Sequence, residues 1–189
     1  MTKMKTRHIF LLALSILINA TLLAQKYTVS PNSQATVIGT STLHDWESEV
    51  EDISGSGNLE FEGTVLKGVP TMEIKFIVKS IESGKGKMNS ITYETLKSES
   101  HPYIKYKVLS LKNVKGDMVT VSGNLTIAGE TRKADVTGRV VKENGTIRIT
   151  GRKKIDMTQF NIEPPKAMFG TIVVGKDIDL DFNILLKQK

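Results

Sequence analysis

The sequence predicts an all-β protein of about eight antiparallel strands with one short helix. From residue 25 onward, most segments alternate apolar and polar residues with the period of two that a strand imposes. Short connections rich in Gly, Asn, Pro and Ser separate these segments, which favours antiparallel neighbours because a parallel pair needs a long crossover. Residues 87–106 break the alternation. So many antiparallel strands must pack as two sheets or close into a barrel, and periodicity does not choose between them.

The first 24 residues have the pattern of a secretory signal peptide. Lys3, Lys5 and Arg7 precede the apolar run Ile9–Ile18, and small residues end the segment at Ala24. The run is shorter than the ~20 apolar residues of a membrane-spanning helix. We therefore expect cleavage after Ala24 and a single periplasmic or secreted domain over residues 25–189. We also expect no stable membrane insertion after cleavage, a retained anchor being the alternative.

The composition excludes several classes of function. Removing the leader takes away three basic residues and no acidic one, so the net charge falls from +6 to +3. The remaining charges of both signs are spread along the strands, which argues against a nucleic-acid partner. The chain has no cysteine, which excludes disulfides, thiolate zinc sites, a cysteine nucleophile and a lipidated cysteine.

The first half of the domain predicts four strands. A short strand at 26–30 ends in a Pro-Asn-Ser turn, and a strand rich in β-branched residues follows at 34–42. The acidic run 47–52 and the Ser/Gly stretch 54–57 are interpreted as a connection to a strand at 58–64. Gly68, Val69 and Pro70 then break the chain before a strand at 71–79. On that strand one face is apolar: Met72, Ile74, Phe76 and Val78.

Residues 87–106 predict the helix. Met88, Ile91 and Leu96 fall at roughly helical spacing, and Asn89 or Ser90 is expected to cap the helix start. Pro102 stops the helix because it disfavours the helical conformation of the residue before it. We expect this helix to cover one end of the β structure.

The second half of the domain predicts five more strands. A strand at 103–111 precedes a hairpin of strands 118–127 and 131–141, and the dipeptide Asn144-Gly145 predicts a tight turn into a strand at 146–155. Two prolines make 156–166 irregular. The last strand, 176–186, alternates Ile, Leu and Phe with Asp and Asn. The basic residues in this half are expected to face outward: Arg132, Lys133, Arg152, Lys153 and Lys154.

Several motifs, taken together and in order, resemble the YceI-like, polyisoprenoid-binding family. They are GTSTLHDWE (39–47), KMNSITYETLKSESHPYIKY (87–106), SGNLTIAGETRKADV (122–136) and VGKDIDLDFNI (174–184). The resemblance runs from about residue 27 to residue 186. It implies a lipocalin-like closed antiparallel β-barrel, exported from bacteria. It further implies an apolar lumen for a long isoprenoid or acyl chain, with the polar head near one mouth.

We therefore hypothesise a non-enzymatic protein that binds a long-chain isoprenoid or fatty amphiphile, with no cofactor and with a homodimer as a further possibility. Some apolar side chains would line the lumen, although each is also suited to an ordinary core: Phe61, Met72, Phe76, Tyr106, Phe160, Phe169 and Phe182. A second set would contact the ligand near the helix and the mouth: His44, Trp46, Lys87, Asn89 and Tyr93.

Two other classes of function stay open at the level of sequence. His44 beside Asp45 is a pair suited to acid–base catalysis, which would make the domain a small hydrolase or isomerase. Alternatively, the barrel is filled by its own side chains and serves as a structural, stress-response module. A metal site is not expected, because only His44 and His101 remain beyond the leader and no ligand-spacing motif is present.

Overall fold

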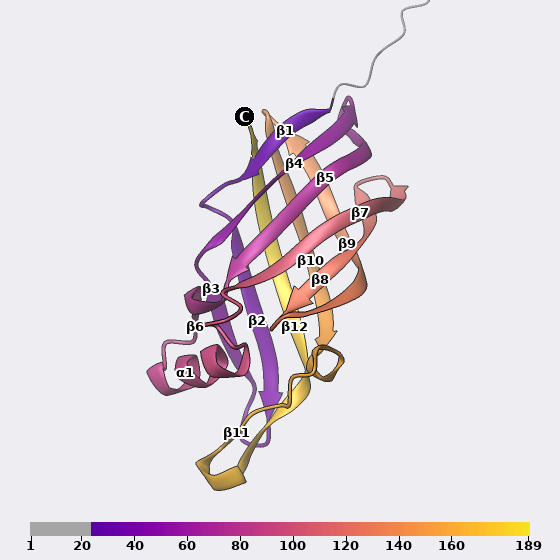
Figure 1. Cartoon of the computed structure of the whole chain (residues 1–189). Coiled ribbons are helices and arrows are strands. Elements are labelled where there is room, and N and C mark those ends of the chain that lie inside the picture. The colour runs from indigo at the N-terminus through magenta and orange to yellow at the C-terminus, as the bar shows by residue number, and fades with distance from the viewer. Residues whose placement is uncertain (1–23) are drawn as a thin grey trace, which may run out of the picture.

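The computed structural model describes residues 24–189, so most of the expected leader, residues 1–23, lies outside the described residues. Twelve strands and one α-helix, α1 (Gly86–Thr95), make up the described part of the chain (Figure 1). The strands are β1 (Gln25–Val29), β2 (Gln34–Ser41), β3 (Trp46–Val50), β4 (Ile53–Glu62), β5 (Val65–Ile77), β6 (Ile81–Glu82), β7 (Tyr103–Lys115), β8 (Met118–Ile127), β9 (Glu130–Glu143), β10 (Thr146–Asp156), β11 (Lys166–Ala167) and β12 (Ile172–Gln188). Three short 3₁₀ helices join them: η1 (Val78–Ser80), η2 (Met157–Phe160) and η3 (Met168–Gly170). No helix within residues 24–189 is long and apolar enough to cross a membrane.

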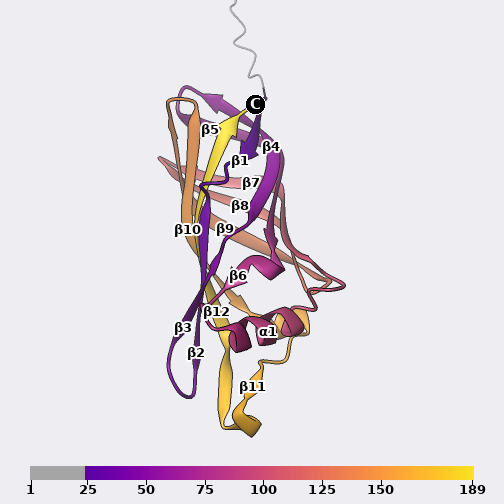
Figure 2. The same cartoon turned by 90° about the vertical axis from the view of Figure 1, so that its left-hand side faces the viewer.

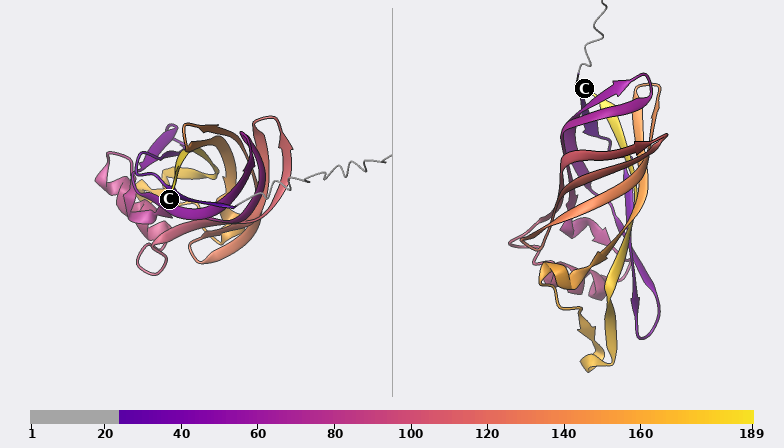
Figure 3. Two further views of the ribbon diagram at one scale, coloured as in Figure 1. Left: turned by 90° about the horizontal axis from the view of Figure 1, so that it is seen from above. Right: turned by 90° about the vertical axis from the view of Figure 1, so that its right-hand side faces the viewer.

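Eight of these strands close into an antiparallel barrel. Their order is β1-β4-β5-β7-β8-β9-β10-β12, and β1 pairs with β12 to complete the ring. Seen from above, the strands form a ring (Figure 3, left). The long strand β12 has β1 beside its upper end and β2 beside its lower end, so that β2, β3 and β6 continue the lower wall. The choice between a sandwich and a barrel is thus settled in favour of the closed barrel, as the resemblance implied.

Strand β12 shows how the alternating sequence builds the wall. Its inward side chains Ile178, Leu180, Phe182 and Ile184 face the interior, and Ile184 is fully buried. At alternate positions, Asp177 and Asp181 face outward and form ion pairs with Lys154 and Arg152 of β10, respectively. Such exposed pairs contribute only about 0–1 kcal/mol each. The alternation therefore fixes the inward face mainly through burial of apolar area.

Two parts of the first half differ from the sequence-based expectation. The acidic run contains strand β3, which pairs with β2 and β6, and its inward residues Ser48 and Val50 are buried. Strand β4 begins at Ile53, so the Ser/Gly stretch lies inside a strand. At Gly55 a Cβ atom would lie 2.2 Å from the carbonyl oxygen of Glu73 on β5. These glycines therefore permit a close approach of two strands and do not mark a turn.

Pro70 also lies within a strand, β5, where a break was expected. Proline is tolerated in a strand only where no ladder hydrogen bond needs its missing N–H. Strand β5 pairs with β7 only from Glu73 onward, so one edge of β5 is free at Pro70. On the other side the β4–β5 register is irregular between Asn58 and Glu60. This local loosening of the ladder allows β5 to start at Val65.

The barrel wall divides between β9 and β10. Their ladder stops at Thr150 opposite Arg139, while β9 stays paired with β8 to its first residue and β10 stays paired with β12 to its last. Below this point β8 and β9 slant away from β10 and β12 (Figure 2). A second core lies at the division, where Met157, Phe160 and Ile162 of the irregular segment after β10 pack with other buried side chains. These include Ile127 at the end of β8, Ala128 directly after it, and Ile155 on β10. The expected irregularity of residues 156–166 is thus confirmed.

Candidate functional site

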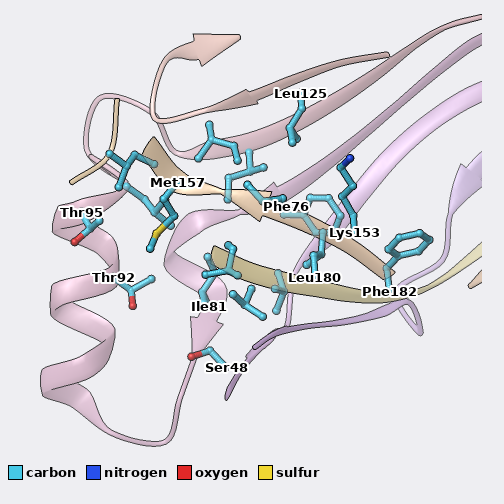
Figure 4. A pocket seen from close by; sticks show the side chains of 18 of the residues that line it. Ser48, Phe76, Ile81, Thr92, Thr95, Leu125, Lys153, Met157, Leu180 and Phe182 are labelled. Atoms are coloured by element: carbon cyan, nitrogen blue, oxygen red, sulfur yellow. The ribbon is translucent and has the colours of Figure 1, made fainter. Parts of the chain in front are cut away.

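The barrel interior contains a cavity of about 860 Å³. This is near the upper end of the ~300–1,000 Å³ range of ligand pockets in proteins. Its wall is built from inward apolar side chains of β5, β7, β8, β9, β10 and β12, among them Phe76, Leu125 and Leu180 (Figure 4). The cavity ends above in a packed layer that contains Tyr27, Phe61, Ile147 and Leu186. Tyr27, Ile147 and Leu186 are completely buried.

Three aromatic side chains of the cavity wall each lie against a glycine of a neighbouring strand. The ring of Trp46 covers Gly39, that of Tyr106 covers Gly123, and that of Phe182 covers Gly151. In each pair, a Cβ atom added to the glycine would come within 2.3–2.6 Å of a ring carbon. An aromatic ring held against the wall occupies less of the lumen than one that points across it. This arrangement keeps the cavity open despite its aromatic content.

Tyr106 on β7 forms a hydrogen bond to β9, beside the division between β9 and β10. Its hydroxyl donates a hydrogen bond to the carbonyl oxygen of Ala134 on β9, at 3.0 Å. Burial, together with the nearby carboxylate of Asp135, raises the pKa of Tyr106 to about 12. The phenol therefore stays neutral and acts as a hydrogen-bond donor from the lumen wall.

Helix α1 lies across the lower end of the barrel, which confirms the expected position (Figures 1 and 2). Met88 and Ile91 of the helix and Leu96 at its C-cap line the cavity, as the helical spacing predicted. Thr92 and Thr95 lie beside them on the helix (Figure 4). These hydroxyl-bearing residues bring polar groups to this end of an otherwise apolar cavity.

The expected cap of this helix is wrong. The helix begins at Gly86 with Lys85 at the N-cap position, and no side chain caps it. Asn89 is inside the helix and buried, where it accepts hydrogen bonds from the backbone N–H and the hydroxyl of Ser83. The Asn89 amide also donates to the carboxylate of Glu82 on β6. Its role is to attach the helix to the barrel.

Tyr93 provides a second attachment of α1. Its hydroxyl lies 2.6 Å from Oε1 of Glu82 and donates a hydrogen bond to it. Burial, and then the hydrogen bond to this carboxylate, raise the pKa of Tyr93 to about 12. Both attachments converge on Glu82, so one residue of the short strand β6 fixes the helix over the cavity.

The lower mouth of the cavity is formed by exposed residues of three segments. They are His44 in the β2–β3 loop, Lys85 and Lys87 at the start of α1, and Lys166 and Phe169 around β11 and η3. Phe169 is fully exposed. The Nδ1 atom of His44 lies 2.6 Å from the main-chain oxygen of its neighbour Asp45. The mouth is therefore basic, with an apolar side chain at its edge.

The structure brings eight of the twelve sequence-predicted residues to the cavity: His44, Trp46, Met72, Phe76, Lys87, Tyr106, Phe169 and Phe182. The other four lie elsewhere. Phe61 packs edge-on against Tyr27 at the upper end, under the ammonium group of Lys142. Phe160 lies in the second core, while Asn89 and Tyr93 face β6. Phe160, Asn89 and Tyr93 therefore do not line the cavity but pack or form hydrogen bonds behind its wall.

One lining residue was assigned to the wrong face. Lys153 was expected to point outward with Arg152 and Lys154, yet it lines the cavity (Figure 4). The alternation of the strand does place Lys153 inward, because it is an even number of residues from Ile149 and Ile155, which also line the cavity. Its charge concealed this orientation, since lysine side chains usually lie at the surface.

Within residues 24–189 no three His, Cys, Asp or Glu side chains are grouped to hold a metal ion. The lining chemistry is thus an apolar tube, a few hydroxyls, one inward lysine and a basic mouth. Such a lining suits a ligand that is mostly hydrocarbon.

Comparison with known proteins places this fold in a family. Residues 27–186 match the YceI-like domain. The chain belongs to the YceI-like family. This confirms the resemblance carried by the motifs, and the match includes at least part of every one of the eight barrel strands, from within β1 to within β12.

Three solved structures superpose on this chain at low sequence identity. BcnA of Burkholderia cenocepacia is 17% identical with a TM-score of 0.69, covering 83% of this chain and 98% of its own. A polyisoprenoid-binding domain from Saccharophagus degradans, implicated in plant cell wall breakdown, is 13% identical with a TM-score of 0.68, covering 86% and 98%. The Campylobacter jejuni YceI protein is 14% identical with a TM-score of 0.59, covering 75% and 84%. No curated protein sequence matches the chain.

Proposed function

We propose that this YceI-like protein binds a long-chain isoprenoid or acyl amphiphile, with its apolar tail in the barrel lumen. The observation that carries the proposal is the 860 Å³ apolar cavity, which is packed shut above and lined at its lower mouth by exposed residues. The protein would transport, store or sequester the amphiphile without chemical change. The description of the Saccharophagus degradans relative as polyisoprenoid-binding supports the same ligand class.

The free energy gained by burying the methylenes of the tail predicts that only long tails bind well. Each buried methylene contributes ~0.8 kcal/mol, so a tail of about 15 methylenes gains roughly 12 kcal/mol. Association costs ~4–15 kcal/mol in lost freedom. A short tail therefore gains too little, whereas a long tail needs few polar contacts.

The expected leader peptide supports a location in the periplasm or outside the cell. There a carrier with a covered lumen would keep an insoluble amphiphile out of water. Mass analysis of the N-terminus after expression in a secreting bacterium tests this point. A retained leader would contradict it.

Catalysis by His44 and Asp45 is less well supported than binding. The ring of His44 contacts the main-chain oxygen of Asp45 and, among the hydrogen bonds of the described residues, none joins it to a carboxylate. A histidine base normally needs such an orienting partner. A completely filled barrel is also disfavoured, because the interior holds a cavity of ligand size.

Native mass spectrometry of residues 25–189 tests the proposal. We expect protein purified without detergent to carry about one extractable lipid per chain, and the same spectrum reports whether a homodimer forms. Ile149→Trp places an indole in the lumen and should reduce lipid loading while the fold persists. Arg148→Trp, on the outer face of the same strand, is the matched control and should load normally. Lipid-free protein that takes up neither isoprenoid nor fatty amphiphiles would refute the proposal.

A further inference from the structure

Lys153 is a charged residue on the inner face of an apolar barrel. It stands directly opposite Leu180 in the β10–β12 ladder, and both side chains line the cavity (Figure 4). Its neighbours in sequence point the other way, where Arg152 pairs with Asp181 and Lys154 with Asp177. The inward position of Lys153 thus follows from the strand period and from the contacts of both flanking residues.

Among the ion pairs of the described residues, none includes Lys153. Its Nζ atom donates one hydrogen bond, of 2.9 Å, to the main-chain oxygen of Asp135 across the division between β9 and β10. The carboxylate of Asp135 lies 2.7 Å from the ammonium of Lys112 on the outer surface, and the pKa of Asp135 is lowered first by that hydrogen bond and least by the charge of Lys153. Among the residues that line the cavity, the one acidic side chain is the exposed Glu94 on α1, at the helix that covers the lower end. An ammonium group has three donors, so two remain for a partner in the lumen.

A bound tail would change the surroundings of this ammonium group. In an empty lumen water can solvate it, because Lys153 is only half-buried. An apolar tail displaces that water and leaves the ammonium group with one hydrogen bond, to the main-chain oxygen of Asp135, which offsets the loss of hydration only in part. An anionic oxygen on the ligand would replace the lost water with charge-assisted hydrogen bonds. Lys153 therefore disfavours a neutral ligand and favours an acidic one.

We propose that Lys153 binds the acid group, a carboxylate or a phosphate, of an anionic amphiphile inside the lumen. This inference rests on the proposed function and names the chemical class of its ligand. It also places the acid group deeper than the mouth, at the division of the wall between β9 and β10. The tail then extends from this point along the apolar wall.

The mouth lysines are a weaker anchor for the same group. Lys85, Lys87 and Lys166 are exposed, so water and salt screen them, and Lys166 lies 3.8 Å from the carboxylate of Glu163. Lys153 acts beside apolar groups, where an ion pair is less screened. If both positions are available to one acid group, the half-buried position discriminates more strongly between acid and alcohol.

The test uses the protein over residues 25–189 and three probes that share one tail: palmitate, hexadecyl phosphate and hexadecanol. Dissociation constants come from displacement of a fluorescent lipid. We expect one or both acids to bind at least about tenfold more tightly than the alcohol, the size expected for hydrogen bonds to a charged group. The carboxylate and phosphate arms show which acid the site prefers.

Substitutions assign this preference to a residue. Lys153→Met should remove the preference for acids while hexadecanol binds as well or better, and Lys153→Arg should keep it. Lys154→Met, one residue along and outward-facing, should leave the preference unchanged, and Lys87→Met, at the mouth, should reduce it less than Lys153→Met does. Equal binding of acid and alcohol by the wild type overturns the inference and leaves the proposed function intact. The same holds if Lys87→Met loses the preference for acids and Lys153→Met keeps it. If none of the three probes and no prenyl probe binds, both this inference and the proposed function are refuted.

A measurement on the wild type alone covers the case in which Lys153→Met does not fold. Palmitate with an isotope-labelled carboxyl carbon is bound and titrated by NMR. Beside an ammonium group its pKa should lie below that of the acid free in water, because the opposite charge favours the ionised form. A bound carboxyl group with a raised pKa would lie in an apolar part of the lumen, away from Lys153, and overturns the inference.

Discussion

The pair of Gly39 and Trp46 allows a quantitative test of how the wall keeps the lumen open. A Cβ atom added at Gly39 would lie 2.3, 2.6 and 2.9 Å from three indole carbons of Trp46, so Gly39→Ala must displace the ring. The indole would lose its hydrogen bond to the carbonyl oxygen of Thr40, now 3.1 Å long. That loss costs about 1 kcal/mol.

The rest of the effect comes from lost burial. A tryptophan buries ~150–250 Å², and re-exposing about a third of that area at ~25 cal/mol per Å² costs roughly 1.5 kcal/mol. Together with the hydrogen bond, Gly39→Ala should lower the free energy of unfolding by about 2–3 kcal/mol. For a domain of this size, each kcal/mol lowers Tm by about 2–4 °C. We therefore expect Tm to fall by about 5–10 °C.

Trp46 is the single tryptophan of the chain, so its fluorescence reports both the ring position and unfolding. Gly39→Ala should shift the emission of the folded protein to longer wavelength and lower Tm. In a Trp46→Leu background, followed by circular dichroism, Gly39→Ala should cost little, because the nearest atoms all belong to Trp46. Gly86→Ala, where no atom lies within 4 Å of the new Cβ, is the matched control. Unchanged emission, or an equal loss of stability without Trp46, would refute the reasoning.

Four further substitutions test separate parts of the molecule. Because the pKa of Tyr106 is raised from 10.0 to about 12, its contribution to stability is complete below pH 10 and is lost as pH rises towards 12. Tyr106→Phe should therefore flatten this alkaline limb in urea unfolding, and an unchanged limb would contradict the assignment. Phe160→Ala should cost ~3–5 kcal/mol in the same assay, since it empties part of the second core. By contrast, Phe169→Ser at the exposed mouth should leave Tm unchanged and slow lipid uptake from vesicles; a lower Tm would show that Phe169 is structural. Asn89→Ala removes the tie to Glu82 and should speed hydrogen exchange in α1 alone, whereas faster exchange throughout the barrel would refute a local role.

The sequence by itself determined the strands that alternate cleanly. The β8 range Met118–Ile127 was predicted to the residue, and the apolar face of β12 is the one that lines the lumen. The helix over the lower end was also predicted, because Met88, Ile91 and Leu96 share a face that alternation cannot produce. These features depend on local periodicity, which is written directly in the order of residues.

Where the local signal was mixed, sequence reasoning failed for physical reasons. Strand β3 has acidic residues on its outer face and includes a buried serine, so it looks like a solvated connection. The helix cap failed because Asn89 bonds to β6, a contact that only the tertiary structure creates. The predicted outward orientation of Lys153 was wrong, because a lysine side chain usually lies at the surface, whereas the alternation of the strand turns this position inward.

Only the tertiary structure decided that the strands close and leave a cavity. Closure depends on β1 meeting β12, where Tyr27 lies opposite Gln188 at the far end of the chain. Alternation states which side of a strand is apolar, but it does not state which strand lies beside it or how much space the inward side chains leave. That space depends on pairs such as Gly151 with Phe182, and it separates a lumen from an ordinary core.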